Sequence, residues 1–235
     1  MYQAKREMHK FLPLSVLAAL ILASVINQGG VIQVSAAPVP NLTSDSSLLT
    51  PFLGQEVSIC YTPENGGDEN GFRPVLELVI PQDLTFKRAD YLGIEVSGES
   101  FTIPPSGELE YNIGRYRRTV SGEPGGTVIV LFPPINNIAP GESFPPVCVI
   151  LKVEEDAVVG RDYLVNGTLI FAYGSDQFDN PNEDPPQVSS KLEVKVRPTL
   201  LKVRKGLGEG IWSHHVVPTG PNYAFNYSLV VSLSL

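Results

Sequence analysis

The chain has 235 residues, enough for one sizeable domain or two small ones, and it carries 17 basic against 25 acidic residues, a formal charge of −8. This balance argues against nucleic-acid binding, which needs clustered cations to contact the phosphates. The densest basic runs beyond the N-terminus are residues 115–118 and 202–205, and we expect both to be solvated strand faces. Glycine and proline are frequent, with 21 of each, which is typical of a fold with many turns.

The N-terminal segment has the pattern of a secretory signal peptide. Lys5, Arg6 and Lys10 precede an apolar run over residues 11–26, and small residues follow up to Ala36. The run is shorter than the roughly 20 residues of a membrane span. We therefore expect cleavage after Ala36 and export to the cell surface. An uncleaved anchor is the alternative, and it would be the chain's only membrane contact.

From residue 37 onward, the sequence predicts short β-strands separated by turns rich in Gly, Pro, Asn and Asp. No amphipathic helix of ten or more residues is evident. Seven or more such strands, most of them alternating apolar and polar residues, predict an all-β, immunoglobulin-like antiparallel β-sandwich over residues 37–197. The expected strands are residues 57–61, 75–80, 91–96, 101–103, 127–132, 147–153, 163–173 and 191–196.

Residues 198–235 predict the start of a second β-sandwich. Two strand-like runs, residues 200–205 and 222–235, follow a boundary near Pro198. A unit of this size rarely buries enough surface to fold alone. The sequence thus favours a second, truncated repeat.

Cys60 and Cys148 are the two cysteines of the chain. In both predicted strands the apolar residues alternate with the cysteine, so both thiols are expected on the outer face of neighbouring strands. They could then form a cross-strand disulfide, which an oxidising compartment would preserve. The alternative is two independent small residues.

Two acidic loops raise the question of a cation site, because Ca²⁺ prefers six to eight carboxylate and carbonyl oxygens. The first, residues 64–70, lacks the spacing of a calcium loop. We interpret it as a wide hairpin in which Gly66, Gly67 and Gly71 supply positive φ. The second loop is the better calcium candidate, and the alternative is a surface loop stiffened by prolines. Its proposed ligands are Asp176, Asp179, Asn182 and Asp184.

Catalysis has little support in the sequence. The pair His214 and His215 is not accompanied by ligands at zinc spacing. No nucleophile elbow, zinc-protease motif or phosphate loop occurs. We predict a protein that is not an enzyme and that holds no cofactor, with calcium as the one option.

Several segments resemble bacterial cell-surface proteins built from tandem β-sandwich repeats, the conserved-repeat and isopeptide-forming fimbrial or adhesin-type family. They are GQEVSICYTPENGG, RPVLELVIPQDLTF, RADYLG, IAPGES, EEDAVVGRDYLVNGTLIFAYGSD and TGPNYAFNYSLVV. The resemblance implies a non-enzymatic stalk or adhesin module whose partners are adjacent repeats or other surface proteins. Some members of such families form Lys–Asn isopeptide bonds. Here the first domain lacks a lysine on its early strands, and Lys202 and Lys205 leave the option only for the second unit.

A rival interpretation is a secreted binding module of the same fold, with a calcium-dependent or carbohydrate-binding role. Its ligand would be a glycan or a protein. Thermal stabilisation by calcium would favour this rival, and its absence would favour the structural module.

Overall fold

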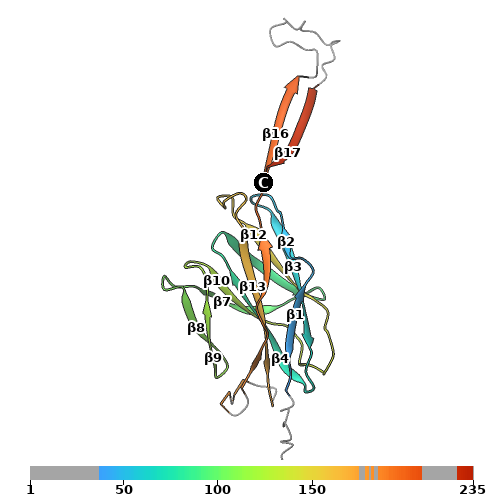
Figure 1. Cartoon of the computed structure of the whole chain (residues 1–235), viewed down its shortest axis with the longest axis vertical. Helices are drawn as coiled ribbons and strands as arrows, with labels where there is room; N and C mark the ends of the chain where they lie inside the picture. The colour runs from blue at the N-terminus through green and yellow to red at the C-terminus, as the bar shows by residue number, and fades with distance from the viewer. Residues whose placement is uncertain (1–36, 175–177, 180, 183–184, 208–226, 235) are drawn as a thin grey trace, which may run out of the picture. The chain divides into compact units, whose positions relative to one another are not determined.

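The computed structural model describes residues 37–174, 178–179, 181–182, 185–207 and 227–234. Every regular element in these residues is a β-strand, and none of them forms a helix, so no membrane-spanning helix occurs in the described part of the chain. Most strands belong to two sheets (Figure 1). The predicted antiparallel β-sandwich is confirmed.

The five-stranded sheet has the order β1-β3-β12-β5-β6. Its strands are β1 (Pro40–Ser44), β3 (Glu56–Asn65), β12 (Val147–Val153), β5 (Leu84–Tyr91) and β6 (Ile94–Glu95). All pairs in this sheet are antiparallel. The two cysteine-bearing strands, β3 and β12, lie side by side, as the sequence predicts.

The eight-stranded sheet has the order β2-β15-β13-β4-β10-β7, with β11 beside β4 and β14 beside β13. Its pairs are antiparallel except for the parallel pair of β15 and β2. The strands are β2 (Leu48–Leu49), β15 (Leu192–Val196), β13 (Tyr163–Ala172), β4 (Gly71–Ile80), β10 (Thr127–Phe132), β7 (Ser97–Thr102), β11 (Asn137–Ile138) and β14 (Gln187–Val188).

The main core fills the space between the two sheets. Ile59 and Tyr61 of β3 and Val149 and Leu151 of β12 are fully buried there. The residues between them are only partly buried. This alternation is what a strand with one face in the core and one toward water requires.

A second apolar cluster covers the other face of the eight-stranded sheet. There the hairpin of β8 (Glu108–Ile113) and β9 (Tyr116–Ser121) packs on β4 and β10. Val75 and Val79 face this cluster, whereas Leu76 and Leu78 face the main core. Because β4 is covered on both faces, it is a continuous apolar run instead of an alternating one. The sequence did not reveal the β8–β9 hairpin.

The loop after β3 was predicted to be a wide hairpin, and this prediction is wrong. β3 and β4 belong to different sheets, so the connection is an arch across the sandwich. Its glycines also lack positive φ. Glycine is needed there because a side chain would clash with neighbouring atoms. A Cβ on Gly71 would lie 2.3 Å from the Phe171 ring, and one on Gly67 would lie 2.2 Å from the Ala37 carbonyl oxygen.

Asn65 closes this arch with its side chain. Its amide oxygen accepts hydrogen bonds from the backbone nitrogens of Val39 and Gly67, both at 3.0 Å. Its amide nitrogen donates to the carbonyl oxygens of Glu69 and Ile138, at 2.7 and 2.9 Å. The side chain is buried and committed to these bonds, so the arch is organised around this asparagine.

The predicted strand over residues 91–96 is also wrong, because a turn divides it. Leu92 and Gly93 have φ values of 50° and 80° and connect β5 to β6. Two consecutive residues with positive φ match the tight hairpin turn whose twist fits the flanking strands. An Asn-Gly pair is the usual signal for this turn, and a Leu-Gly pair gives none.

The last described strands are β16 (Leu200–Leu207) and β17 (Tyr227–Ser234), which form an antiparallel hairpin. They correspond to the two strand-like runs expected after residue 198. Their assignment to a second sandwich stays a prediction, as do the boundaries of the domains. The signal-peptide prediction, residues 1–36, falls outside the described residues, as do His214 and His215.

Candidate functional site

The segment that follows β1 and the last segment of the sandwich run parallel to each other and are paired directly. β15 pairs with β2 in parallel, and an isolated parallel bridge joins Phe52 to Thr199. We call this pairing of residues 47–53 with residues 195–199 the terminal clamp. Its backbone hydrogen bonds include Lys195 N to Ser47 O (3.0 Å), Arg197 N to Leu49 O (2.8 Å), Thr199 N to Pro51 O (2.7 Å) and Leu53 N to Thr199 O (3.3 Å).

The chain enters and leaves the sandwich at opposite ends of β3. At the entry, Ala37 N donates to Asp68 Oδ1 at 3.0 Å, in the loop that follows β3. At the exit, Thr199 pairs with Phe52, shortly before β3 begins. β3 has ten residues, which corresponds to about 33 Å of extended strand. Tension applied to the two connections would therefore run along the strands (Figure 1).

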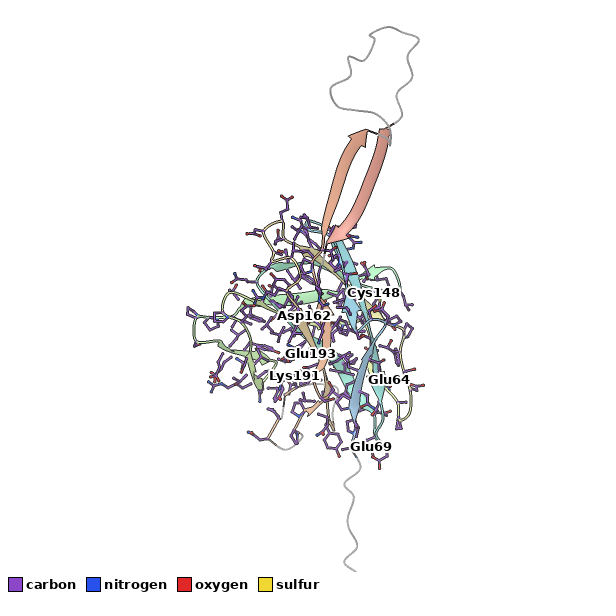
Figure 2. All side chains as sticks on the ribbon, turned by 45° about the horizontal axis from the view of Figure 1, so that its top comes forward. Glu64, Glu69, Cys148, Asp162, Lys191 and Glu193 are labelled. Carbon is purple, nitrogen blue, oxygen red and sulfur yellow. A yellow bond between two sulfur atoms is a disulfide. The ribbon has the colours of Figure 1, made fainter. Side chains whose placement is uncertain are left out.

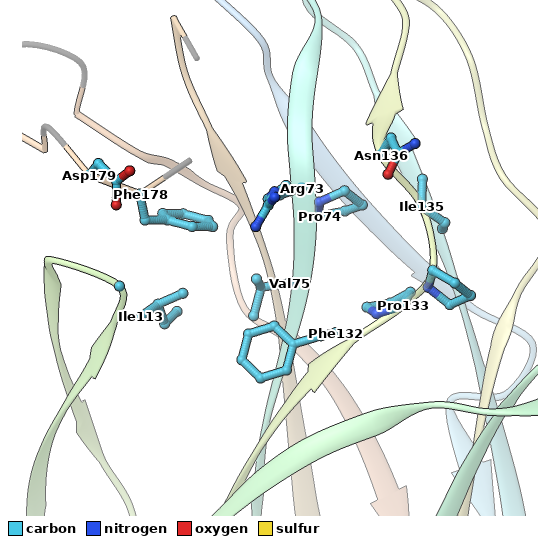
Figure 3. A pocket seen from close by; sticks show the side chains of 12 residues that line it. Arg73, Pro74, Val75, Ile113, Phe132, Pro133, Ile135, Asn136, Phe178 and Asp179 are labelled. Atoms are coloured by element: carbon cyan, nitrogen blue, oxygen red, sulfur yellow. The ribbon is translucent and has the colours of Figure 1, made fainter. Parts of the chain in front are cut away.

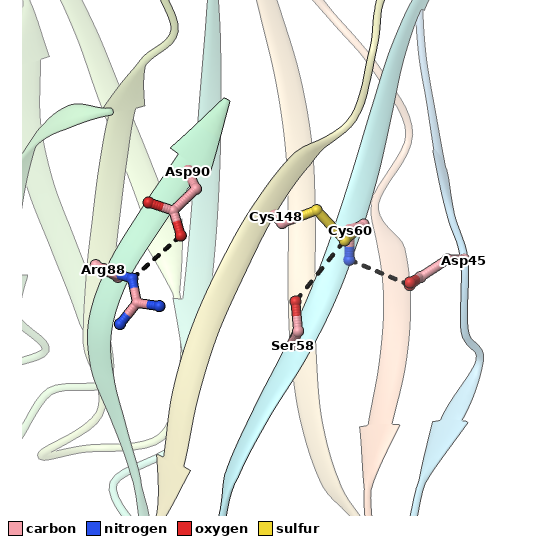
Figure 4. Close-up of a disulfide and its surroundings, with 6 residues drawn as sticks. All are labelled: Asp45, Ser58, Cys60, Arg88, Asp90 and Cys148. Atoms are coloured by element: carbon pink, nitrogen blue, oxygen red, sulfur yellow. Dashed lines mark hydrogen bonds and ion pairs between the residues drawn. A yellow bond between two sulfur atoms is a disulfide. The ribbon is translucent and has the colours of Figure 1, made fainter. Parts of the chain in front are cut away.

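Cys60 and Cys148 are directly opposite each other in the β3–β12 ladder. The structure joins their sulfur atoms at 2.06 Å, with 88 residues of sequence separation (Figure 4). Both side chains lie on the outer face of the five-stranded sheet, since their neighbours in sequence point into the core. Asp45 lies beside the bond, where its carboxylate accepts a hydrogen bond from Cys60 N at 3.1 Å. The bond staples the two central strands of this sheet.

A buried ion pair lies beneath the β8–β9 hairpin. Glu77 of β4 is 1% exposed, and its two carboxylate oxygens accept hydrogen bonds of 2.9 Å from Nε and Nη2 of Arg118. The Tyr111 hydroxyl donates to the same carboxylate. The run 115–118 was predicted to be a solvated strand face, which is wrong for Arg118, whose side chain turns inward.

The ionisation of this cluster suits fixing the β8–β9 hairpin in place and does not suit proton transfer. Burial raises the pKa of the Tyr111 hydroxyl, and the neighbouring Glu77 charge raises it further. The hydrogen bonds with Glu77 raise the pKa of the Arg118 guanidinium. Tyr111 thus stays neutral and Arg118 stays charged near neutral pH. The three side chains pin the β8–β9 hairpin to the sheet.

Charged side chains also stabilise the segment by which the chain leaves the sandwich. Arg197 donates to the carboxylate of Asp162, which is labelled in Figure 2, through Nε at 2.6 Å and through Nη2 at 3.1 Å. Lys195 Nζ lies 4.0 Å from the same carboxylate. These hydrogen bonds from Arg197 lower the pKa of Asp162. Because Arg197 also forms part of the terminal clamp, the ion pair links that clamp to the start of β13.

The calcium candidate is only partly described. Asp176 and Asp184 lie outside the described residues, and Asp179 and Asn182 are exposed. Within the described part of the chain, no group of three or more His, Cys, Asp or Glu side chains is placed to hold a metal ion. Lys202 lies in β16, and Lys205 follows on the same strand. The calcium and isopeptide hypotheses stay predictions.

No protein-family model matches the sequence, and no curated protein matches it. Among solved structures, the chain is similar to BcpA, the major pilin subunit of Bacillus cereus, with 12% identity, a TM-score of 0.38 and coverage of 71% of this chain and 42% of the pilin. It is similar to the seventh ScaB type I cohesin of Pseudobacteroides cellulosolvens, with 13% identity, a TM-score of 0.39 and coverage of 75% and 99%.

A further similar structure is AvmM, which catalyses macrocyclization in alchivemycin A biosynthesis, with 14% identity, a TM-score of 0.34 and coverage of 76% and 92%. The match to the pilin spans less than half of that subunit. All three TM-scores are below 0.5, so these likenesses assign neither a family nor a function. The fold assignment rests on the strand order of the chain itself.

Proposed function

We propose that this chain is a non-enzymatic, exported surface module that carries tension between the parts of a stalk or adhesin. The observation that carries the proposal is the terminal clamp. A load that pulls residue 37 away from residue 199 acts first on β1, which is paired with β3, and then slides the two parallel segments of the clamp past each other. The hydrogen bonds of the clamp are then loaded together instead of one after another, which favours a high unfolding force.

The disulfide supports the same function by limiting how far the module extends. Cys60 and Cys148 are separated by 88 residues, and the chain between them cannot be pulled straight while the bond is intact. At about 3.5 Å per extended residue, the bond withholds roughly 300 Å of extension. A module that unfolds only at high force and then extends little is suited to link other parts of a cell-surface protein.

Single-molecule force spectroscopy of the secreted chain, pulled through its two ends, tests the proposal. Thr199→Pro removes the N–H that donates to Pro51 O, and we expect it to lower the unfolding force. Thr199→Val keeps that N–H and loses only the hydroxyl, whose 3.0 Å hydrogen bond also reaches Pro51 O; it is the matched control. Equal unfolding forces in the wild-type chain and the proline variant would exclude a mechanical role for the clamp.

The rival binding module is tested with calcium and glycans. A calcium-dependent rise in melting temperature that Asp179→Asn abolishes would favour it, as would glycan binding. In the tension-bearing module, neither ligand is needed, and we expect the melting temperature to be unchanged by calcium.

A further inference from the structure

A pocket of about 420 Å³ lies on the side of the eight-stranded sheet that carries the β8–β9 hairpin (Figure 3). The apolar side chains that line it come from β4, from the end of β10 and the residues after it, from the tip of the hairpin and from Phe178. Its rim is polar, with Arg73 and Asp179 as charged groups. The side chains that the argument uses are Arg73, Val75, Ile113, Phe132, Phe178 and Asp179.

Arg73 is held at this rim by a rare backbone conformation. Its φ is 42°, in the left-handed region that side chains other than glycine seldom adopt. The next residue is Pro74, and a residue that precedes proline normally prefers the extended region. The Arg73 nitrogen donates to Asn136 O at 2.8 Å, which fixes this conformation. Such strain is found mainly where a side chain has a task that the fold alone does not require.

The Arg73 guanidinium is exposed and, within the described part of the chain, makes no ion pair or side-chain hydrogen bond. Arg118, another arginine near β4, is already paired with Glu77. An uncompensated guanidinium above an apolar pocket is a ready partner for a carboxylate, because its planar fork matches the two carboxylate oxygens.

The opposite wall of the pocket is held in place by the hairpin tip. Arg115 N donates to Phe178 O at 2.9 Å, and the Tyr116 and Phe178 rings stack at 6.4 Å. Gly114 has a φ of 57°, and a Cβ there would lie 3.2 Å from Phe178. This close approach leaves Phe178 facing the pocket. The wall is thus formed before any ligand arrives, which reduces the entropy cost of binding.

We infer that this pocket binds an apolar carboxylate, an aromatic or branched aliphatic group that carries a carboxylate beside it. The apolar group lies against Val75, Ile113 and Phe132, and the carboxylate pairs with Arg73. Asp179 repels a carboxylate from its own side of the rim and so fixes the orientation. The volume is near the lower end for ligand sites, which suits one or two residues of a peptide C-terminus or a small acid.

Other ligand classes match the pocket less well. A phosphate group needs several convergent donors, and Arg73 is the only cationic side chain among the residues that line it. A neutral apolar ligand would leave the Arg73 charge unpaired. The inference does not depend on the tension-bearing role, because the pocket contains none of the clamp residues.

Titration of the full secreted chain with N-acetylphenylalanine, followed by NMR chemical shifts, tests the inference. We expect saturable shifts with a Kd of about 1 mM or tighter and at least about tenfold weaker binding of N-acetylphenylalanine amide. A hexapeptide ending in a free Phe carboxylate distinguishes the two sources of the ligand. Tighter binding of the hexapeptide indicates a partner's C-terminus, and equal binding indicates a small acid.

Arg73→Gly is the decisive variant, because glycine accepts positive φ without strain. We expect it to fold with an unchanged or higher melting temperature and to bind the acid at least about tenfold more weakly. Arg88→Gly, at an exposed arginine of the five-stranded sheet, is the control and should bind normally. Equal binding of acid and amide, retained binding in Arg73→Gly, or no saturable binding of either probe would each overturn the inference.

Discussion

The Glu77 carboxylate and the Arg118 guanidinium meet through two hydrogen bonds of 2.9 Å, although 41 residues separate them in the chain. Removing the cation alone leaves a buried, uncompensated carboxylate, which typically costs 3–5 kcal/mol. Because the Arg118 side chain keeps 18% exposure, we expect Arg118→Met to destabilise the sandwich by about 2–3 kcal/mol. Urea unfolding at pH 7 measures this loss.

The control for this prediction removes all three polar groups together. In the triple variant Glu77→Leu, Arg118→Met and Tyr111→Phe, no buried polar group is left without a partner. We expect most of the lost stability to return. If the triple variant were no more stable than Arg118→Met, the cluster would act through packing and not through charge.

The bond between Cys60 and Cys148 predicts a large contribution to stability. We expect the double variant Cys60→Ala, Cys148→Ala to lose about 2–4 kcal/mol, because the unfolded chain gains freedom when an 88-residue link is released. Denaturant unfolding with and without reductant measures it. Reductant should destabilise the wild-type chain and leave the double variant unchanged. Free thiols in a non-reducing peptide map of the secreted protein would contradict the bond.

Because Asp162 pairs with Arg197, we expect the stability of the sandwich to depend on pH. The folded state lowers the pKa of Asp162, so its contribution is present above the unfolded pKa of about 3.9 and is lost as the pH falls through the folded pKa. Asp162→Asn should therefore lower the melting temperature slightly at pH 7. The difference from the wild-type chain should shrink as the pH falls below about 3.9 and disappear once the pH lies below the lowered folded pKa. A difference that is constant from pH 7 to pH 2.5 would rule out the charge as its cause.

Tyr61 predicts a stabilising substitution. Its side chain is fully buried, and its hydroxyl has no hydrogen-bond partner among the described residues. An unpaired buried hydroxyl costs about 1–3 kcal/mol. Tyr61→Phe keeps the ring and removes this cost, so we expect a gain of about 1 kcal/mol in unfolding free energy. A loss of stability in thermal unfolding would show that the hydroxyl is satisfied.

The alternating residues of the cysteine-bearing strands were sufficient to predict several features. Ile59 and Tyr61 determine which face of β3 enters the core, and Val149 does so for β12. Because the side-chain period of a strand is two, these residues also determine that Cys60 and Cys148 point outward. The all-β class follows from the many short alternating strands.

Sequence signals are weaker where the relevant partner is distant. The turn at Leu92 has no usual turn residue at its first position, so the strand was predicted to continue. The arch after Asn65 contains the same residue types as a hairpin, and only the sheet to which β4 belongs distinguishes them. The strained Arg73 has no sequence signal, because its conformation depends on the distant Asn136 and on a register shift in the pairing of β4 with β13.

By itself, the sequence determined several of the core strands, their inward faces and the outward direction of both cysteines, because these depend on neighbours within a few residues. Only the tertiary structure decided that Glu77 and Arg118 are partners, that the terminal segments run parallel, and that Arg73 stands above an apolar pocket. Each of these relationships joins residues from separate strands. The pairing order that brings them together is set by burial across the whole sandwich, which no local pattern records.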